Sequence, residues 1–320
     1  MTITAAPVAG SSESPPVTSA PAPRRRRRNL TPLYLALPAV GIMVVAQGYP
    51  LVTQFLMSFQ EFGLRQQFGA PADWVGLSNY IAVLSDPGFW AVLWRTLLFA
   101  AVCATATMVI GVLAAILMGR VKAWVRVSLQ VAMLLAWATP HLSSLTVWQW
   151  LFNTRNGVVN NALVAMGFTQ FANHGWLLDP VSFFAIAAAV VIWGSVPLVM
   201  LMTYAAMTQV DTEVLEAAQL DGTTGAQRFR HVVLPWIAPM LLLVGLLQII
   251  WDLRVFTQIS VLQDGGAVAS ETNLLGTYIY QVGLGQGNYG SGSAIAMIML
   301  LLTLVITFGY VRELMRRGDA

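Results

Sequence analysis

Two charged side chains lie inside an apolar run, where a charge is costly. Asp252 and Arg254 occur in the segment QIIWDLRVF, two positions apart. Side chains two apart on a helix do not face each other, so these residues are not an internal pair. Polar groups at membrane depth usually face a cavity or another chain. Two interpretations stay open. One is contact with a solute or gating. The other is a salt bridge to a partner chain, or a position near the outer membrane face.

A second group of polar residues occupies the loop 209–235, between two long apolar runs. Asp211 and Thr212 are N-cap candidates for a first short helix, because either side chain can accept from free amides. Gly222 can supply the left-handed residue that ends a helix. Thr224 and Gln227 have the spacing of a capping box for a second helix. We therefore expect two short helices that meet at Gly222.

The sequence lacks the residues that disulfide formation, metal binding, hydrolytic catalysis and ATP binding would need. The single cysteine, Cys103, lies in an apolar run, so a disulfide framework and a thiolate metal site are excluded. No H-E-x-x-H, G-x-S-x-G or Walker-type G-x-x-x-x-G-K-[ST] segment occurs. We therefore expect no enzyme activity, no metal and no ATP bound by this chain. The ring of His141 is expected to bond to a carbonyl freed by Pro140.

Composition requires that these residues be positioned by membrane-spanning helices. Hydrophobic residues make up 57% of the 320 residues and charged residues only 10%, against about 25% charged in soluble domains. A bilayer core takes about 20 apolar residues as a helix, and prolines 50, 140 and 197 are expected to kink their helices. Six runs qualify as spans, over residues 33–59, 90–118, 127–152, 182–207, 236–260 and 293–311.

The basic residues predict the orientation of the chain in the membrane. Of 17 lysines and arginines, 13 lie before the first span, after the last, or in alternate loops. By the positive-inside rule, both termini and the 209–235 loop are then cytoplasmic. The 13 residues are Arg24, Arg25, Arg26, Arg27, Arg28, Arg120, Lys122, Arg126, Arg228, Arg230, Arg312, Arg316 and Arg317.

The first 29 residues predict a disordered cytoplasmic tail that ends in the arginine run. They are rich in Pro, Ser, Ala, Thr and Val, a composition that does not bury a core. The apolar run that follows is too long for a signal peptide, and five more spans come after it. The arginines are interpreted as a topology anchor, with binding to acidic lipid as the alternative. Residues 30–320 then form one six-helix membrane domain.

The 209–235 loop resembles the EAA motif of permease subunits in binding-protein-dependent ABC importers. That family's pattern is E-A-A-x-x-D-G-A, a spacer, and L-P. Two further segments, WVGLSNYIAVLSDPGFW and NGVVNNAL, resemble the maltose-type branch, and together the likeness covers most of the chain after residue 30. The motif residues here are Glu216, Ala217, Ala218, Asp221, Gly222, Phe229, Leu234, Pro235 and Pro239.

The sequence also departs from the family pattern. Thr223 stands where the motif usually has alanine. After the fifth span the family commonly reads F-D-x-I-x-x-L-T-x-G-G-P, and Thr257, Gln263 and Ala267 replace its aspartate, threonine and proline. These changes leave the solute open and do not affect the loop.

The resemblance implies the type I ABC importer permease fold, all-helical with six transmembrane helices, in the bacterial cytoplasmic membrane. It implies that the loop is a coupling helix that docks in a groove of a cytoplasmic ATPase subunit. Gly222 would set the bend, Ala217 and Ala218 would permit close approach, and Glu216 would pair with a basic residue of the ATPase. Asp221 completes the coupling set. The alternative is a loop that only caps two helices.

The resemblance also implies the partners and the solute class. The partners would be a second, homologous permease in a heterodimer, two ATPase subunits that bind ATP and magnesium, an extracytoplasmic binding protein, and membrane lipid, with no nucleic acid. The solute would be a sugar or oligosaccharide. A phosphorylated polyol such as glycerol 3-phosphate is the alternative, and a secondary carrier is a rival class. Candidate solute contacts are Trp148, Gln149, Trp193, Trp251, Asp252, Arg254, Tyr278 and Asn288.

Overall fold

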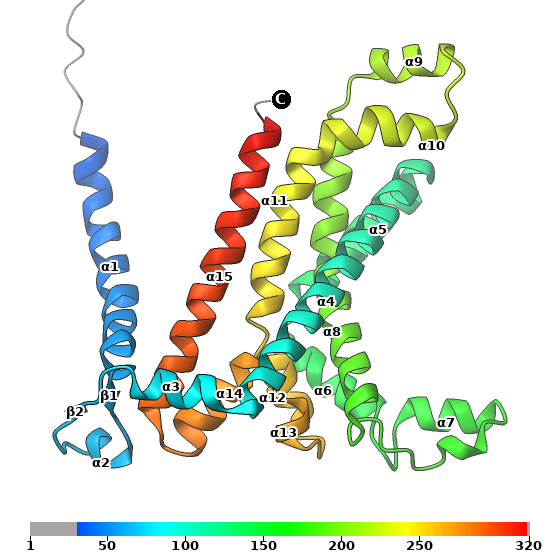
Figure 1. Cartoon of the computed structure of the whole chain (residues 1–320). Helices are drawn as coiled ribbons and strands as arrows, with labels where there is room; N and C mark the ends of the chain where they lie inside the picture. Colours follow the sequence, from blue (N-terminus) through cyan, green and yellow to red (C-terminus); the bar gives the residue numbers. More distant parts are fainter. Residues whose placement is uncertain (1–30, 319–320) are drawn as a thin grey trace, which may run out of the picture. The chain divides into compact units, whose positions relative to one another are not determined.

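The structure of the chain is a computed structural model that describes residues 31–318 (Figure 1). The chain divides after Pro50 into two compact units. Helix α1 (Thr31–Met57) begins in the first unit, ends in the second, and carries Pro38 and Pro50 within its length. The expected tail of residues 1–29, with its arginine run, lies outside the described residues.

The second unit is helical apart from one small hairpin. Strands β1 (Gln60–Glu61) and β2 (Asp73–Trp74) pair antiparallel, with Gln60 opposite Trp74. The long helices are α4 (Pro87–Arg120), α5 (Ala123–Ala138), α8 (Pro180–Met207), α11 (Leu234–Leu253) and α15 (Tyr289–Gly318). The short α-helices are α2 (Leu64–Gln67), α3 (Ser78–Ser85), α6 (His141–Leu151), α7 (Val158–Ala165), α9 (Thr212–Leu220), α10 (Gly225–Arg228), α12 (Thr257–Gln263), α13 (Ala269–Thr272) and α14 (Leu275–Tyr280). A 3-10 turn, η1 (Thr169–Phe171), and two π-helical turns, η2 (Phe229–Val233) and η3 (Gln281–Gly285), complete the chain order.

Five helical stretches among the described residues are long and apolar enough to cross a membrane. Two of them, α4 and α8, begin in the same way. The Asp86 side chain accepts a hydrogen bond from the Gly88 amide at 2.8 Å, and the Asp179 side chain accepts one from the Ser182 amide at 3.0 Å. Each aspartate precedes a proline at the first helical position, where a missing amide hydrogen costs nothing. The five stretches are Leu35–Met57, Pro87–Arg120, Pro180–Met207, Gly225–Gln263 and Tyr289–Arg316.

The third span, expected over residues 127–152 with a kink at Pro140, is fully broken at that proline. The segment forms two helices, α5 and α6, which are separated at Thr139 and Pro140. Thr139 is extended, with ψ of 130°. The ring of Pro140 disfavours the helical region for the preceding residue, and it also removes a backbone donor. A single proline therefore divides this helix, whereas α8 continues through Pro197.

The fifth span also ends earlier than expected. Helix α11 stops at Leu253, and a short non-helical segment precedes α12. No proline or glycine marks this break in the sequence WDLRVFT. The break turns the chain so that residues of α11 and α12 face the same cavity.

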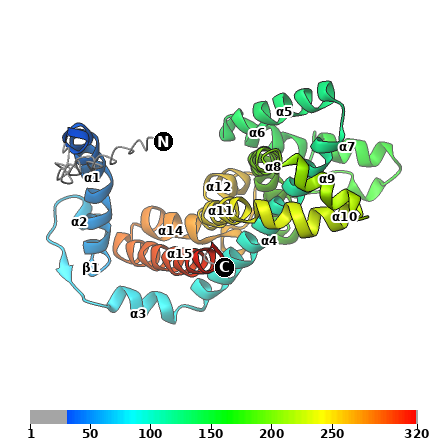
Figure 2. The ribbon, with the colours of Figure 1, turned by 90° about the horizontal axis from the view of Figure 1, so that it is seen from above.

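Helices α4, α8 and α11 pack against one another in the centre of the second unit (Figure 2). The crossing of α4 and α8 is close, because a Cβ added at Gly111 would lie 2.6 Å from Val199 Cγ1. Helix α5 packs against α8, and α15 packs against α11. This frame holds the cavity described next and carries the α9–α10 loop at one end.

Candidate functional site

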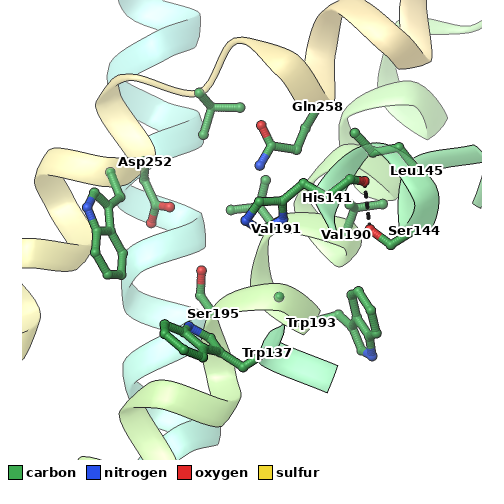
Figure 3. A pocket seen from close by; sticks show the side chains of 13 residues that line it. Trp137, His141, Ser144, Leu145, Val190, Val191, Trp193, Ser195, Asp252 and Gln258 are labelled. Carbon is green, nitrogen blue, oxygen red and sulfur yellow. Dashed lines mark hydrogen bonds between the residues drawn. The ribbon is translucent and has the colours of Figure 1, made fainter. Parts of the chain in front are cut away.

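A cavity of about 370 Å³ lies between the α5–α6 break, the middle of α8 and the end of α11 (Figure 3). Its position follows from the two helix breaks, because α12, which begins after the second break, packs against both α6 and α8. The lining residues are Trp137, His141, Ser144, Leu145, Val190, Val191, Trp193, Gly194, Ser195, Trp251, Asp252, Val255 and Gln258.

Asp252 is the most unusual residue of the cavity. It is 1% exposed, and its Oδ1 accepts a hydrogen bond of 2.8 Å from the amide of Gln248, which is also 1% exposed. Its Oδ2 has no hydrogen-bond partner among the described residues. A buried carboxylate oxygen without a donor is costly. The cavity therefore offers an unfilled acceptor to a molecule that carries N–H or O–H groups.

The ring of His141 extends into the cavity across from Asp252 (Figure 3). The expectation that this ring bonds to a freed carbonyl is wrong, since it makes no hydrogen bond with the described residues. A Cβ added at Gly194 would lie 3.9 Å from His141 Cε1, so the ring lies close to the backbone of α8 at this point. Ser195 and Gln258 add further polar groups to the wall.

Three tryptophans supply the apolar wall, namely Trp137, Trp193 and Trp251. Each keeps part of its side chain accessible. Trp148 lies behind Trp193, with ring centroids 6.2 Å apart, and it stacks on Phe152. Flat apolar faces beside hydrogen-bonding groups suit a molecule with both C–H faces and hydroxyls.

The remaining candidate solute contacts lie outside this cavity. The Gln149 amide donates to the Val261 carbonyl, and Arg254 is exposed beyond the end of α11. The Tyr278 hydroxyl donates to Asp86 Oδ2 at 2.9 Å. Burial raises the pKa of Tyr278 to about 12, and the bond to Asp86 adds to that rise. Asn288 Oδ1 accepts from the Ser291 amide at 3.1 Å, at the start of α15.

The structure therefore brings three of the eight candidates together, Trp193, Trp251 and Asp252. Five polar or aromatic lining residues were not among the solute-contact candidates: Trp137, His141, Ser144, Ser195 and Gln258. Ser195 and Gln258 are polar residues within apolar runs, which was a usable signal. Ser144 is also a polar residue of an apolar run and carried the same signal. Trp137 carried none, because it reaches the cavity only through the break at Pro140.

The loop at the other end of α11 has the local geometry expected from its sequence. Gly222 has φ of +78° and directly follows Asp221, the C-cap of α9. Thr224 Oγ1 accepts from the Gln227 amide at 3.3 Å, and Gln227 Oε1 accepts from the Thr224 amide at 2.8 Å. Both the left-handed glycine and the capping box are confirmed. Asp211 occupies the N-cap position of α9 without a side-chain bond.

Thr223, the departure from the motif's alanine, has a structural part in this bend. Its hydroxyl donates to the carbonyl of Ala218 at 2.6 Å, and its amide donates to the same oxygen at 3.3 Å. The last turn of α9 is thereby closed, since helix ends leave carbonyls without amide partners. The substitution therefore supports the helix end at this position.

Helix α9 is held from one side and open on another. Leu215 packs against a small cluster that includes Val210, Val233 and Ile237. Leu220 is 89% exposed, and Ala217 is also exposed.

Glu216 belongs to a different face of α9. It lines a hollow of about 420 Å³ together with Arg120 and Arg228. In that hollow the Arg228 guanidinium donates to Gln219 Oε1 at 3.2 Å.

Comparisons with known proteins agree with this architecture. Residues 108–315 match the model of the family described as binding-protein-dependent transport system inner membrane component. The chain belongs to this family, and it is therefore a multi-pass membrane protein and a permease subunit.

Its sequence is similar to the diacetylchitobiose uptake system permease protein DasB of Streptomyces coelicolor. The identity is 37% over 290 residues, which cover 91% of this chain and 88% of the relative. It is also similar to the trehalose/maltose transport system permease protein MalF of Thermococcus litoralis. There the identity is 32% over 242 residues, which cover 75% of this chain and 79% of the relative.

The fold is similar to that of a solved bacterial ABC transporter involved in the import of the acidic polysaccharide alginate. The TM-score is 0.77 at 22% sequence identity, and the match covers 90% of this chain and 96% of that chain. At this identity the likeness establishes the fold alone.

Proposed function

We propose that this chain forms half of the translocation path of an ATP-driven importer of a sugar or oligosaccharide. The observation that carries the proposal is the position of α11. Its amino-terminal end continues from the α9–α10 loop through η2, and its carboxyl-terminal end presents Asp252 to the cavity. One helix thus joins the segment that resembles a coupling helix to the candidate solute site.

The lining of the cavity supports a neutral sugar over a phosphorylated polyol. Tryptophan faces and the unfilled acceptor of Asp252 suit a sugar's C–H faces and hydroxyls. No lysine or arginine occurs among the described residues that line the cavity, and the one charged lining residue is the acidic Asp252. A phosphate would meet no cation there. The names of the relatives, which concern diacetylchitobiose, trehalose and maltose, support the same solute class.

We propose that the exposed face of α9 docks on a separate ATPase subunit that holds ATP and magnesium. Ala217, Ala218, Asp221 and Gly222 would shape this contact. Glu216 faces the hollow that carries Arg120, so a basic group of the ATPase would have to enter that hollow to reach it. Glu216→Ala is expected to reduce uptake and solute-stimulated ATP hydrolysis while the chain stays in the membrane.

The experiment is reconstitution of the permease with its ATPase, its second permease and its solute-binding protein in vesicles. Vanadate-sensitive uptake of labelled oligosaccharide that depends on the binding protein supports the proposal. Uptake that continues without ATP would refute an ATP-driven importer. Unchanged coupling of ATP hydrolysis to uptake in Glu216→Ala would refute the role proposed for Glu216.

We propose that the second permease is a different, homologous chain. One copy of this chain supplies one α9 loop, whereas two ATPase subunits require two loops. Two differently tagged copies of this chain should not co-purify from cells that express the whole complex. An active complex that contains both tags and no second permease contradicts a heterodimer.

A further inference from the structure

Helix α3 lies across the ends of the long helices rather than along them (Figures 1 and 2). It spans Ser78–Ser85, packs against α15, and ends just before α4 begins at Pro87. A helix in this place lies at the level where the adjoining span leaves the bilayer. Its surface therefore has to suit the region between lipid and water.

One face of α3 is fixed to the protein. Val83 is buried in a cluster that includes Phe89 and Ile295. The amide of Asn79 donates to the carbonyl of Ser58 at 3.0 Å and to that of Gln60 at 2.9 Å. These bonds set the rotation of the helix, so the directions of its other faces are determined.

A second face is apolar and uncovered. Leu77, Ile81 and Leu84 follow the spacing of one helix face, and they are 60%, 64% and 45% exposed. A third face, beside it, carries Ser78, Ala82 and Ser85, which are exposed and small. The exposed part of α3 is thus divided into an apolar side and a small, mainly polar side.

The apolar face continues onto the first turns of α4. Trp90 is exposed there, and its indole N–H donates to the Leu84 carbonyl at 2.9 Å. Trp94, one turn further along, is 67% exposed. Tryptophans gather where a span meets the water boundary, because the ring is apolar and its N–H is polar.

We propose that the Leu77–Ile81–Leu84 face of α3 is inserted in lipid at the membrane–water boundary beside the Pro87 end of α4. The occupant is lipid because the face is uncharged and continuous with the exposed tryptophans of a membrane-spanning helix. An amphipathic helix in the plane of the boundary buries its apolar face among the acyl chains and leaves its polar face in water. The polar face, which is then left in water, is the one that carries Ser78, Ala82 and Ser85.

The test uses two matched single-cysteine variants, Ile81→Cys and Ser85→Cys, in a Cys103→Ala background. Each is labelled with a bimane fluorophore, and the whole importer complex is reconstituted in phosphatidylcholine vesicles. Half of each sample receives lipid with a doxyl quencher high on its acyl chain, and the other half receives iodide in the water. The expected result is at least about twofold stronger doxyl quenching at Ile81 than at Ser85, with the reverse order for iodide.

Each other outcome overturns the proposal. Iodide quenching at both positions places α3 in water. Protection of Ile81 from both quenchers places another protein chain on this face, either the second permease or the solute-binding protein. Equal doxyl quenching at both positions means that α3 is not divided between lipid and water. Uptake by the labelled complexes confirms that both variants are folded.

Discussion

At the scale of single residues, the cavity depends on one carboxylate and its neighbour one turn away. Gln248 occupies one oxygen of Asp252 and leaves the other free, although both residues are 1% exposed. A carboxylate accepts hydrogen bonds and does not donate them. The free oxygen of Asp252 therefore favours a solute that brings a hydrogen-bond donor into the cavity.

Asp252→Asn tests this selection, because asparagine keeps an acceptor for Gln248 and loses the charge. A hydrogen bond to a charged group is worth about 1.5–3 kcal/mol, so the half-saturating solute concentration for uptake should rise about tenfold or more. Binding-protein-stimulated uptake over a range of solute concentrations measures it. Arg254→Gln, two residues on and exposed, is the control and should have no such effect. Unchanged uptake in Asp252→Asn would show that no donor contacts this carboxylate.

Gly222 offers a residue-scale test of the bend after α9. Its φ is +78°, and a Cβ added there would meet nothing within 4 Å, so only backbone strain distinguishes substitutions. A β-branched residue in this region costs about 1–2 kcal/mol, whereas asparagine tolerates it. Gly222→Val should uncouple ATP hydrolysis from uptake and Gly222→Asn should be milder. ATPase stimulation by solute-loaded binding protein is the measurement, and equal damage by both variants would count against the bend.

At the scale of helices, sequence predicted most where local rules decide the outcome. The glycine bend and the capping box were predictable, because each depends on a few neighbouring residues. Three of the expected spans match α1, α4 and α8 to within a few residues, and the sixth lies inside the longer α15. The break after Leu253 could not be predicted from the sequence, since neither proline nor glycine marks it. The cavity was predicted only in part for the same reason, because packing of α6 and α12 on α8 assembles its walls.

The crossing of α4 and α8 gives an element-scale prediction at Gly111. A Cβ there would lie 2.6 Å from Val199 Cγ1 and 3.3 Å from the Met200 amide nitrogen. Gly111→Ala should therefore destabilise the packing by about 1–3 kcal/mol, as overpacking does. Gly119→Ala on the same helix meets nothing within 4 Å and is the control. The thermal aggregation midpoint of the detergent-purified complex should fall only for Gly111→Ala, and adding Val199→Ala should partly restore it.

At the scale of the second unit, charge is divided between its two ends. The α9–α10 loop, the α4–α5 turn and the end of α15 lie at one end, while α2, α3 and α7 lie at the other (Figure 1). The first end carries seven of the described basic residues that flank the spans: Arg120, Lys122, Arg126, Arg228, Arg230, Arg312 and Arg316. The other end carries four, Arg65, Arg95, Arg155 and Arg254. The fold thus gathers basic residues from two loops and the end of α15 at one end, the distribution that the positive-inside rule predicts for a cytoplasmic face.

The orientation can be measured with two cysteines that protrude from opposite ends. Leu220 is 89% exposed on α9, and Phe68 is 86% exposed beyond α2. In a Cys103→Ala background, a membrane-impermeant maleimide should label Phe68→Cys and not Leu220→Cys in spheroplasts. In inverted vesicles washed with urea to remove peripheral ATPase, Leu220→Cys should be labelled and Phe68→Cys protected. Charge bias acts when the chain inserts, so each end should be labelled from one side only. Labelling of Leu220→Cys in spheroplasts would place α9 outside the cell, where no ATP-hydrolysing subunit could reach it.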